Sequence, residues 1–265
     1  MKIVLFAAFP QELKHLRKSF GSVKKSGECP FPLFIAKQHA CEIIAVQTGM
    51  STVNIETACR HIRGKYRPDV VLSVGFCGAL YSEARIGDLV WASQCLHFSE
   101  GETNPPYGHA VITAIPADAG RKNFLEKLHG RIRIQEGSFV TLSAWMPKSR
   151  LMRAIPRDIP FPVCDRETFY LAKWSYQNRL PFFAVRSVTD RADEDIPQEL
   201  FRVTDETGHY SFSRALGILI AKPSLIFDSV KLGRNAARAS RRLCHAVNAL
   251  LEILSAPETR SRQYP

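Results

Sequence analysis

The chain has 265 residues, of which 45% are hydrophobic, and this fits one large domain with a sizeable core. No apolar run approaches the roughly 18–20 residues needed to span a bilayer. The net charge of +11 gathers in two basic zones, residues 14–25 and 231–242. Solvated helix faces explain such zones, and so does an anionic partner such as a membrane surface or a phosphorylated substrate. No nucleic-acid-binding module accompanies them, so we expect no nucleic-acid partner.

Short apolar runs alternate with helical patterns along the chain. Residues 2–8 predict a core strand and not a secretory leader, because charged, helix-forming residues follow without a cleavage site; we therefore expect a cytoplasmic protein. In chain order we predict a helix over 11–20, strands over 32–37 and 42–48, a helix over 51–66, strands over 69–75 and 86–93, a loop over 97–117 that covers part of a pocket, a helix over 118–129, a strand over 132–142, a buried strand before a helix over 166–178, a strand over 181–188, and helices over 210–221 and 224–254.

This alternation predicts an α/β fold. We expect a single-domain, three-layer α/β/α sandwich with a central mixed, mainly parallel sheet. No shift in composition marks a linker. Residues 1–222 are expected to form the body, and residues 223–265 a basic amphipathic helix and tail that extend the same domain.

The cysteines and histidines indicate neither a disulfide framework nor a metal site. The seven cysteines form no C-x-x-C pair and include an odd one, so reduced thiols are expected. The histidines show no H-E-x-x-H or comparable ligand spacing. We predict no metal.

The stretch from Phe161 to Asp195 carries the clearest functional signal. It predicts a buried strand, a helix that opens on acidic residues, and an apolar strand that ends in Thr189-Asp190. Glu167 and Asp190 therefore follow strand ends, where ligands bind in open α/β sheets. One carboxylate can hold a polyol while the other, partly desolvated, donates a proton. That division of labour favours an enzyme that cleaves nucleosides, although a helix-dipole contact and a turn cap are the ordinary roles of these two residues.

Several separated motifs carry a family resemblance over roughly residues 1–220. In chain order they are the first strand with Glu12 behind it, Thr48-Gly49-Met50-Ser51-Thr52-Val53-Asn54, Gly75-Phe76-Cys77-Gly78, the segment 139–146, Asp165-Arg166-Glu167, and Val185-Arg186-Ser187-Val188-Thr189-Asp190. Together they resemble the purine nucleoside phosphorylase/uridine phosphorylase superfamily, and within it the methylthioadenosine/S-adenosylhomocysteine nucleosidase branch.

The resemblance implies hydrolysis of the N-glycosidic bond of a purine nucleoside, with adenine as the expected base and a modified 5′ position. It implies that Asp190 protonates the base, that Glu12 orients or deprotonates water, and that Arg186 positions the nucleophile or pairs with Glu12. Ribose contacts are implied for Glu167 and Arg166, and base contacts for Phe76, Cys77, Gly78, Trp145 and Met146. No cofactor is expected, and a homo-oligomer, typically a dimer, is.

Two departures from the family pattern leave alternatives open. Phe76 stands where relatives commonly have Ser or Thr, and Arg166 replaces the usual methionine beside the ribose. A guanidinium can bind an anion, so a phosphorylase with phosphate as co-substrate is the alternative to hydrolysis. The first loop, however, lacks the Gly-Asp-Pro with which many phosphorylases bind phosphate. A nucleoside-binding protein with weakened catalysis is a further alternative.

A second, shorter resemblance concerns the C-terminal helix. Leu232-Gly233-Arg234 and Arg241-Arg242, with the bulky Phe76, resemble hopanoid-associated nucleoside phosphorylases, which are thought to act on adenosylhopane. The apolar side of this helix can pack against the body or a second subunit. Its central arginines, among them Arg238, can instead dock on anionic lipid.

Overall fold

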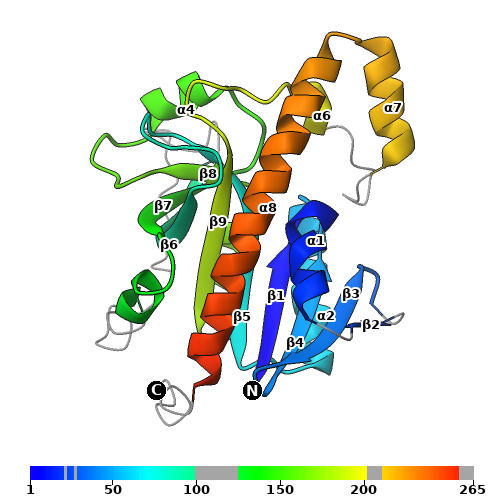
Figure 1. The fold of residues 1–265 in the computed structure, drawn as a ribbon, viewed down its shortest axis with the longest axis vertical. Helices are drawn as coiled ribbons and strands as arrows, with labels where there is room; N and C mark the ends of the chain where they lie inside the picture. Colours follow the sequence, from blue (N-terminus) through cyan, green and yellow to red (C-terminus); the bar gives the residue numbers. More distant parts are fainter. Residues whose placement is uncertain (21–22, 27–28, 99–124, 202–210, 257–265) are drawn as a thin grey trace.

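The structure, a computed structural model, describes residues 1–20, 23–26, 29–98, 125–201 and 211–256 (Figure 1). The predicted loop over 97–117 lies outside these described residues, except for its first two residues, which end a strand. Of the predicted helix over 118–129, residues 125–129 are described, and they are helical.

The described strands form one mixed sheet. Their bounds are Lys2–Ala7 (β1), Val23–Ser26 (β2), Leu33–Gln38 (β3), Cys41–Gln47 (β4), Val70–Ala79 (β5), Leu89–Phe98 (β6), Gln135–Leu142 (β7), Val163–Asp165 (β8) and Phe182–Asp190 (β9). The strand order is β2-β3-β4-β1-β5-β8-β7-β6-β9. β1 is parallel to β4 and β5, β9 to β5, and β7 to β6 and β8, whereas β2–β3, β3–β4, β5–β8 and β6–β9 are antiparallel.

Part of this sheet closes on itself, because β5 also pairs with β9. β5, β8, β7, β6 and β9 therefore form a ring, with β1, β4, β3 and β2 extending from β5. The Gly75–Gly78 stretch, predicted as a turn after a shorter strand, is part of β5. This stretch stays extended because neighbouring strands on both sides pair with its backbone N–H and C=O groups: Gly78 is paired with Cys164 of β8 and with Asp190 of β9.

Helices cover both faces of the sheet. They span Pro10–Ser19 (α1), Thr52–Lys65 (α2), Lys148–Ala154 (α4), Thr168–Gln177 (α5), Gln198–Phe201 (α6), Phe212–Ala221 (α7) and Leu225–Ser255 (α8). Figure 1 shows α8 running across one face beside α1. The core under these two helices includes Leu16 and Leu250, and the opposite core, under α2 and α5, includes Ile62 and Ala172. The three-layer α/β/α fold predicted from the sequence is confirmed.

Three described elements had no counterpart in the prediction: β2, α4 and α6. Each is short, at seven residues or fewer, so none repeats its apolar spacing often enough for a sequence pattern to detect it. No helix within the described ranges is both long enough and apolar enough to cross a membrane. α4 matters most for function, because it begins at a residue of the candidate site.

Candidate active site

A cavity of about 450 Å³ lies where β1, β5, β7, β8 and β9 end. Its size is typical of sites that enclose a small organic ligand. All but one of the residues that the sequence predicted for the site line this cavity: Glu12, Phe76, Cys77, Gly78, Trp145, Met146, Arg166, Glu167 and Asp190. The exception, Arg186, is buried behind the lining. α8 and α7 supply the wall opposite the sheet.

The pairing of β5 with β9 brings two charged side chains to one side of the sheet. Arg186 and Asp190 are four residues apart in β9, so their side chains share a face. Their partners in β5, Gly75 and Gly78, are only three residues apart. A register shift between Cys77 and Gly78 absorbs the odd residue. Each glycine thereby lies opposite one charged group, and these two groups anchor two separate polar clusters.

Arg186 is the centre of the first cluster. It is 1% exposed; its Nε donates to Asp165 Oδ2 at 3.0 Å, and its Nη2 donates to Thr168 Oγ1 at 2.9 Å and to Glu167 Oε2 at 3.3 Å. Burial opposes the charge, but Asp165, Glu167 and Glu12 outweigh burial and raise the pKa of Arg186. The guanidinium therefore stays charged and holds several carboxylates in place.

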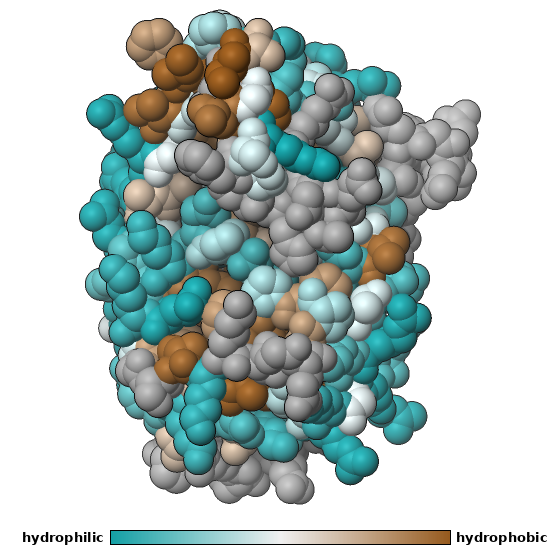
Figure 2. All heavy atoms as spheres, turned by 90° about the vertical axis from the view of Figure 1, so that its right-hand side faces the viewer, coloured by the Kyte–Doolittle hydropathy of each residue, from teal (hydrophilic) through white to brown (hydrophobic). Residues whose placement is uncertain are grey.

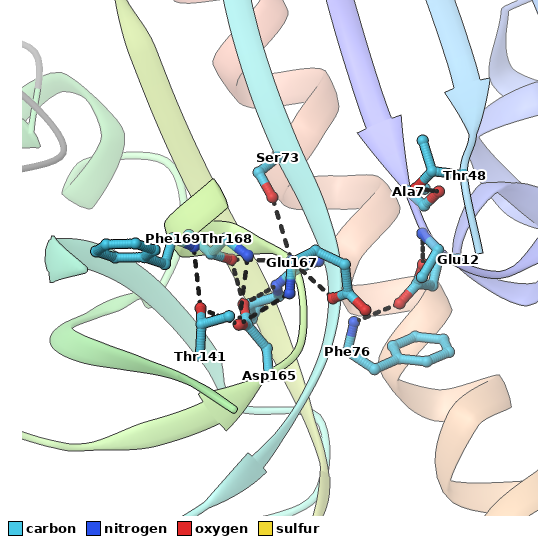
Figure 3. Close-up of polar contacts among 12 residues, drawn as sticks. Ala7, Glu12, Thr48, Ser73, Phe76, Thr141, Asp165, Glu167, Thr168 and Phe169 are labelled. Carbon is cyan, nitrogen blue, oxygen red and sulfur yellow. Dashed lines mark hydrogen bonds and ion pairs between the residues drawn. The ribbon is translucent and has the colours of Figure 1, made fainter. Parts of the chain in front are cut away.

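Gly75 makes room for this cluster. A Cβ atom at this position would lie 2.1 Å from Arg186 Nη1 and 2.5 Å from Glu12 Oε1. Glycine is required here because the guanidinium and the carboxylate approach the β5 backbone from the same side. Figure 3 shows Glu12 and Glu167 directed toward the same space beside the backbone of Phe76.

Glu12 is fixed by backbone amides rather than by a side-chain partner. Its Oε2 accepts hydrogen bonds from Ala8 N at 2.7 Å and Phe9 N at 2.9 Å, and its Oε1 accepts from Phe76 N at 2.8 Å. Burial raises the pKa of Glu12, and Arg186 and these amides oppose that rise. A carboxylate held rigidly, with a raised pKa, at the edge of a cavity is suited to orient a water molecule and accept its proton.

Glu167 has the more strongly shifted carboxyl group. Burial, opposed by Arg186 and reinforced by Asp165 and Glu12, raises the pKa of Glu167 to about 8. Burial therefore favours the protonated form of Glu167 more than in an exposed glutamate. A cation or a cluster of hydroxyl donors in the cavity would favour the ionised form, which is the behaviour expected of a residue that holds a polyol.

The second polar cluster joins Asp190 to Lys148, the first residue of α4. Both side chains are buried, and Lys148 Nζ forms an ion pair with Asp190 Oδ2. Asp190 Oδ1 accepts a hydrogen bond from Thr189 Oγ1 at 2.7 Å. Burial raises the pKa of Asp190, while Lys148 and the Thr189 hydroxyl partly offset this rise. Asp190 is therefore a candidate proton donor that carries a counter-ion.

Aromatic and sulfur-containing side chains line the cavity beside these clusters. Trp145 Nε1 donates to the carbonyl oxygen of Ile196 at 3.1 Å, which ties the indole ring to the loop after β9. Met146 is buried next to it, and Phe76 lines the cavity from β5. Such flat and polarisable side chains suit a planar heterocycle.

Arg166 lies next to Glu167 on the cavity wall. Its Nη2 donates to the carbonyl oxygen of Ser143 at 3.0 Å, and its Nε is buried without a hydrogen-bond partner. A buried guanidinium N–H at a cavity wall is free to donate to a ligand oxygen.

Comparison with known proteins identifies the family. The phosphorylase superfamily pattern matches residues 2–220. The chain belongs to the phosphorylase superfamily. The 5′-methylthioadenosine/S-adenosylhomocysteine nucleosidase of Shewanella loihica is 23% identical over 229 residues, which are 83% of this chain and 99% of that protein. The predicted superfamily membership is thereby confirmed.

Solved structures of this superfamily share the fold. The methylthioadenosine/S-adenosylhomocysteine nucleosidase of S. pneumoniae, solved with the transition-state inhibitor MT-ImmA, has a TM-score of 0.71 at 16% identity and covers 96% of this chain and 100% of its own. A futalosine hydrolase mutant of Helicobacter pylori has a TM-score of 0.68 at 15% identity, with 94% and 99% covered. The protein is therefore an enzyme of a superfamily that cleaves N-glycosidic bonds of nucleosides.

The superfamily motifs did not reveal Lys148 or the structural role of Asp165. A positive side chain at the first position of a helix is disfavoured by the helix dipole, and this placement is the one local signal that Lys148 serves a purpose outside α4. In the sequence, Asp165 stands out only as part of the Asp-Arg-Glu motif. In the structure it accepts hydrogen bonds from Thr141 Oγ1 at 2.6 Å and from Arg186.

Proposed function

We propose that this superfamily member hydrolyses the N-glycosidic bond of a 5′-modified adenine nucleoside. In this proposal Asp190 protonates the base and Glu12 orients the attacking water. The observation that carries it is the shared cavity: Asp190 with its counter-ion lies at one polar cluster, and Glu12 and Glu167 lie at the other.

The proposed reaction needs only the nucleoside, one water molecule and the side chains of Asp190, Glu167 and Glu12. The bond between the base nitrogen and the anomeric carbon breaks, its electron pair stays with the base, and the Asp190 proton goes to the purine ring. The sugar becomes cationic, and ionised Glu167 favours that charge while accepting hydrogen bonds from the ribose hydroxyls. Water then bonds to the anomeric carbon and passes its proton to Glu12. The products are free adenine and the free sugar.

Phosphorolysis is the second candidate, and Arg166 is the observation in its favour. Its buried, unpartnered Nε–H beside Glu167 is a donor suited to an oxyanion. Against it, Glu12 is buried and has a raised pKa in a position suited to water, and an attacking phosphate needs no general base of that kind. We therefore place hydrolysis first.

The size of the 5′ group is a separate part of the proposal. Beyond the carboxylates the cavity wall is apolar or small, with Ile196, Leu200, Ala215, Leu232 and Ala236 contributed by the region from the end of β9 to α8. A wall of this kind accepts a thioether or a longer hydrocarbon group. Methylthioadenosine is the first substrate to test, and adenosylhopane is the bulkier alternative.

Chromatography of the products tests the proposed reaction. We expect free adenine and free sugar from methylthioadenosine or S-adenosylhomocysteine without phosphate, with adenosine as the unmodified control. Adenine that forms only with phosphate, together with a sugar 1-phosphate, would replace hydrolysis by phosphorolysis. If adenosylhopane also yields no adenine, a nucleoside-binding protein with weakened catalysis becomes the favoured alternative.

We also propose contact with an anionic membrane, through an apolar patch in addition to the predicted arginines of α8. Arg238 and Arg242 are exposed on α8, and their Cγ atoms would lie 3.3 and 3.5 Å from a Cβ atom on Gly87, in the turn before β6. The hairpin patch, by contrast, consists of large exposed apolar side chains on α7 and the first turns of α8: Leu216, Ile220, Ile226, Phe227 and Val230. Figure 2 shows apolar side chains gathered at this end of the molecule. Asp228 is the one acidic residue between positions 211 and 251, so the surroundings favour an anionic surface.

Co-sedimentation with vesicles containing phosphatidylglycerol tests this contact. We expect the double variant I220S/F227S to bind at least about 10-fold more weakly, since each buried apolar side chain contributes roughly 1.5–3 kcal/mol. Val53→Ser, which removes an exposed apolar side chain from α2, is the matched control. Unchanged binding of I220S/F227S would refute the contact. We also propose that the protein forms a homo-oligomer. If this oligomer dissociates in I220S/F227S and not in Val53→Ser, the hairpin patch instead contacts a second copy of the chain.

A further inference from the structure

The Lys148–Asp190 pair has a geometry that the general reaction does not require. Lys148 Nζ donates to the carbonyl oxygens of Asp190 at 3.2 Å and Arg191 at 2.5 Å, in addition to its ion pair with Asp190 Oδ2. An ammonium group has three N–H bonds, and these three acceptors use them all. Lys148 therefore has no donor left for a ligand, and it acts on the reaction through Asp190.

The backbone holds Lys148 in this position. Its amide nitrogen donates to Asp195 Oδ1 at 2.7 Å, which links the start of α4 to the loop after β9. A Cβ atom on Gly78 would lie 2.6 Å from Asp190 Oδ2 and 2.8 Å from Lys148 Cε. The ion pair thus lies directly against β5, in the place that glycine leaves open, as Arg186 and Glu12 do at Gly75.

The two oxygens of Asp190 have different surroundings. Oδ2 faces the ammonium group, which favours an unprotonated oxygen there. Oδ1 meets the Thr189 hydroxyl, which also lies 3.3 Å from the carbonyl oxygen of Cys77. The hydroxyl has one hydrogen, so it either donates to Asp190 Oδ1 or turns to Cys77 and accepts a proton from Oδ1. Both protonation states of Asp190 are therefore accommodated at Oδ1 without moving the carboxyl group.

We propose that Lys148 is a positioning residue for proton transfer: it anchors Asp190 by Oδ2 and its ammonium charge stabilises the carboxylate that remains after Asp190 has protonated the leaving base. This inference rests on the proposed N-glycosidic cleavage. The proton moves from Asp190 Oδ1 to the base, the electron pair of that O–H bond stays on the carboxylate, and Lys148 keeps its own protons throughout. Without Lys148, the step would leave an unpaired carboxylate in a buried site.

The other titratable groups around the pair do not supply this charge. Cys77 on β5 and Cys164 on β8 face it, and burial raises the pKa of both thiols, so they stay neutral. Asp193, Glu194 and Asp195 in the loop after β9 are acidic and supply no positive charge, and Glu194 raises the pKa of Asp190. Among the described neighbours of Asp190, Lys148 is the cation that forms an ion pair with it.

The pH dependence of kcat separates this role from simple structural support. Activity that needs protonated Asp190 falls as pH rises through the pKa of Asp190, and the Lys148 charge lowers that pKa. In Lys148→Met we expect the falling limb to move upward by about 1 pH unit or more. We also expect the low-pH plateau of kcat to drop roughly 10-fold, because a weaker acid is a poorer donor. Lys148→Arg, which keeps the charge, should leave the limb near its wild-type position, as should Lys173→Met, which removes an exposed lysine on α5.

A Lys148→Met enzyme that is slower at every pH with an unmoved limb would overturn the inference. A second measurement does not depend on turnover. In protein labelled with ¹³C at the aspartate carboxyl carbons, the Asp190 resonance is the one lost in Asp190→Asn. Its titration midpoint should rise in Lys148→Met, and an unchanged midpoint would refute the role of Lys148. If wild-type protein cleaves no nucleoside, the proposed function fails, while this titration still decides whether the lysine controls the carboxyl group. If Lys148→Met does not fold, the same titration in Lys148→Gln applies.

Discussion

Asp190→Asn is expected to lower kcat by roughly 10²–10⁴-fold, which is the usual contribution of a well-placed general acid. The amide has nearly the size of the carboxyl group, but it cannot release a proton to the base. Lys148 loses its ionic partner in this variant, yet it keeps the carbonyl oxygens of Asp190 and Arg191 as acceptors. The fold and the affinity for adenine should therefore be retained, as measured by circular dichroism and by the thermal shift with adenine.

The matched control for this variant is Asp193→Asn. Asp193 lies three residues further on and pairs with Arg191 at the surface. The Asp193→Asn substitution removes the same charge three residues away, at a position that does not line the cavity, so kcat should not change. Turnover of Asp190→Asn within a few-fold of the wild type would remove Asp190 from the role of proton donor. Equal losses in both variants would point to the charge of the loop rather than to one carboxyl group.

The sequence predicted the site best where its residues follow directly from a strand. Glu167 and Asp190 come at the ends of apolar runs, and parallel neighbours bring such ends to one edge of the sheet. Glu12 follows the first strand in the same way. These side chains line one cavity because short segments of regular structure determine their positions.

Contacts that depend on long-range pairing were not predictable in this way. Lys148 and Asp190 are 42 residues apart in sequence, and nothing near either residue indicates the other. The ring of strands depends on β5 pairing with three neighbours, and the shift at Cys77–Gly78 that aligns Gly78 with Asp190 has no local signature. The C-terminal arginines are exposed on α8, although Arg238 and Arg242 also lie beside Gly87, so their contact with lipid stays a prediction.

The two polar clusters differ in what holds their charge. Around Arg186, one guanidinium is shared by Asp165, Glu167 and Glu12, and the pKa of Glu167 rises to about 8. Around Asp190, one carboxyl group has one ammonium partner. The carboxyl groups of the first cluster therefore outnumber its guanidinium, and in the proposed reaction the cationic sugar would add positive charge beside them. The second is balanced when Asp190 is ionised, which is its state after the proposed proton transfer.

Arg186→Met is expected to destabilise the protein by about 3–5 kcal/mol, the usual consequence of removing one partner from a buried ionic cluster. Methionine fills much of the volume, but Asp165, Glu167 and Glu12 then lie buried without their shared cation. Denaturant unfolding measures the loss. Arg191→Met, which removes an exposed arginine paired with Asp193, is the control and should leave the unfolding midpoint unchanged.

The pH dependence of this loss identifies its cause. Without Arg186 the folded-state pKa values of Glu12 and Glu167, which burial already raises, rise further above their unfolded values. Raised folded-state pKa values mean that the native protein binds more protons than the unfolded chain, so stability falls as pH rises. The gap between Arg186→Met and the wild type should therefore be largest at alkaline pH and shrink as acid protonates the cluster. If the difference in unfolding free energy is the same at every pH, Arg186 stabilises the fold by packing, and its charge does not stabilise the carboxylates of Asp165, Glu167 and Glu12.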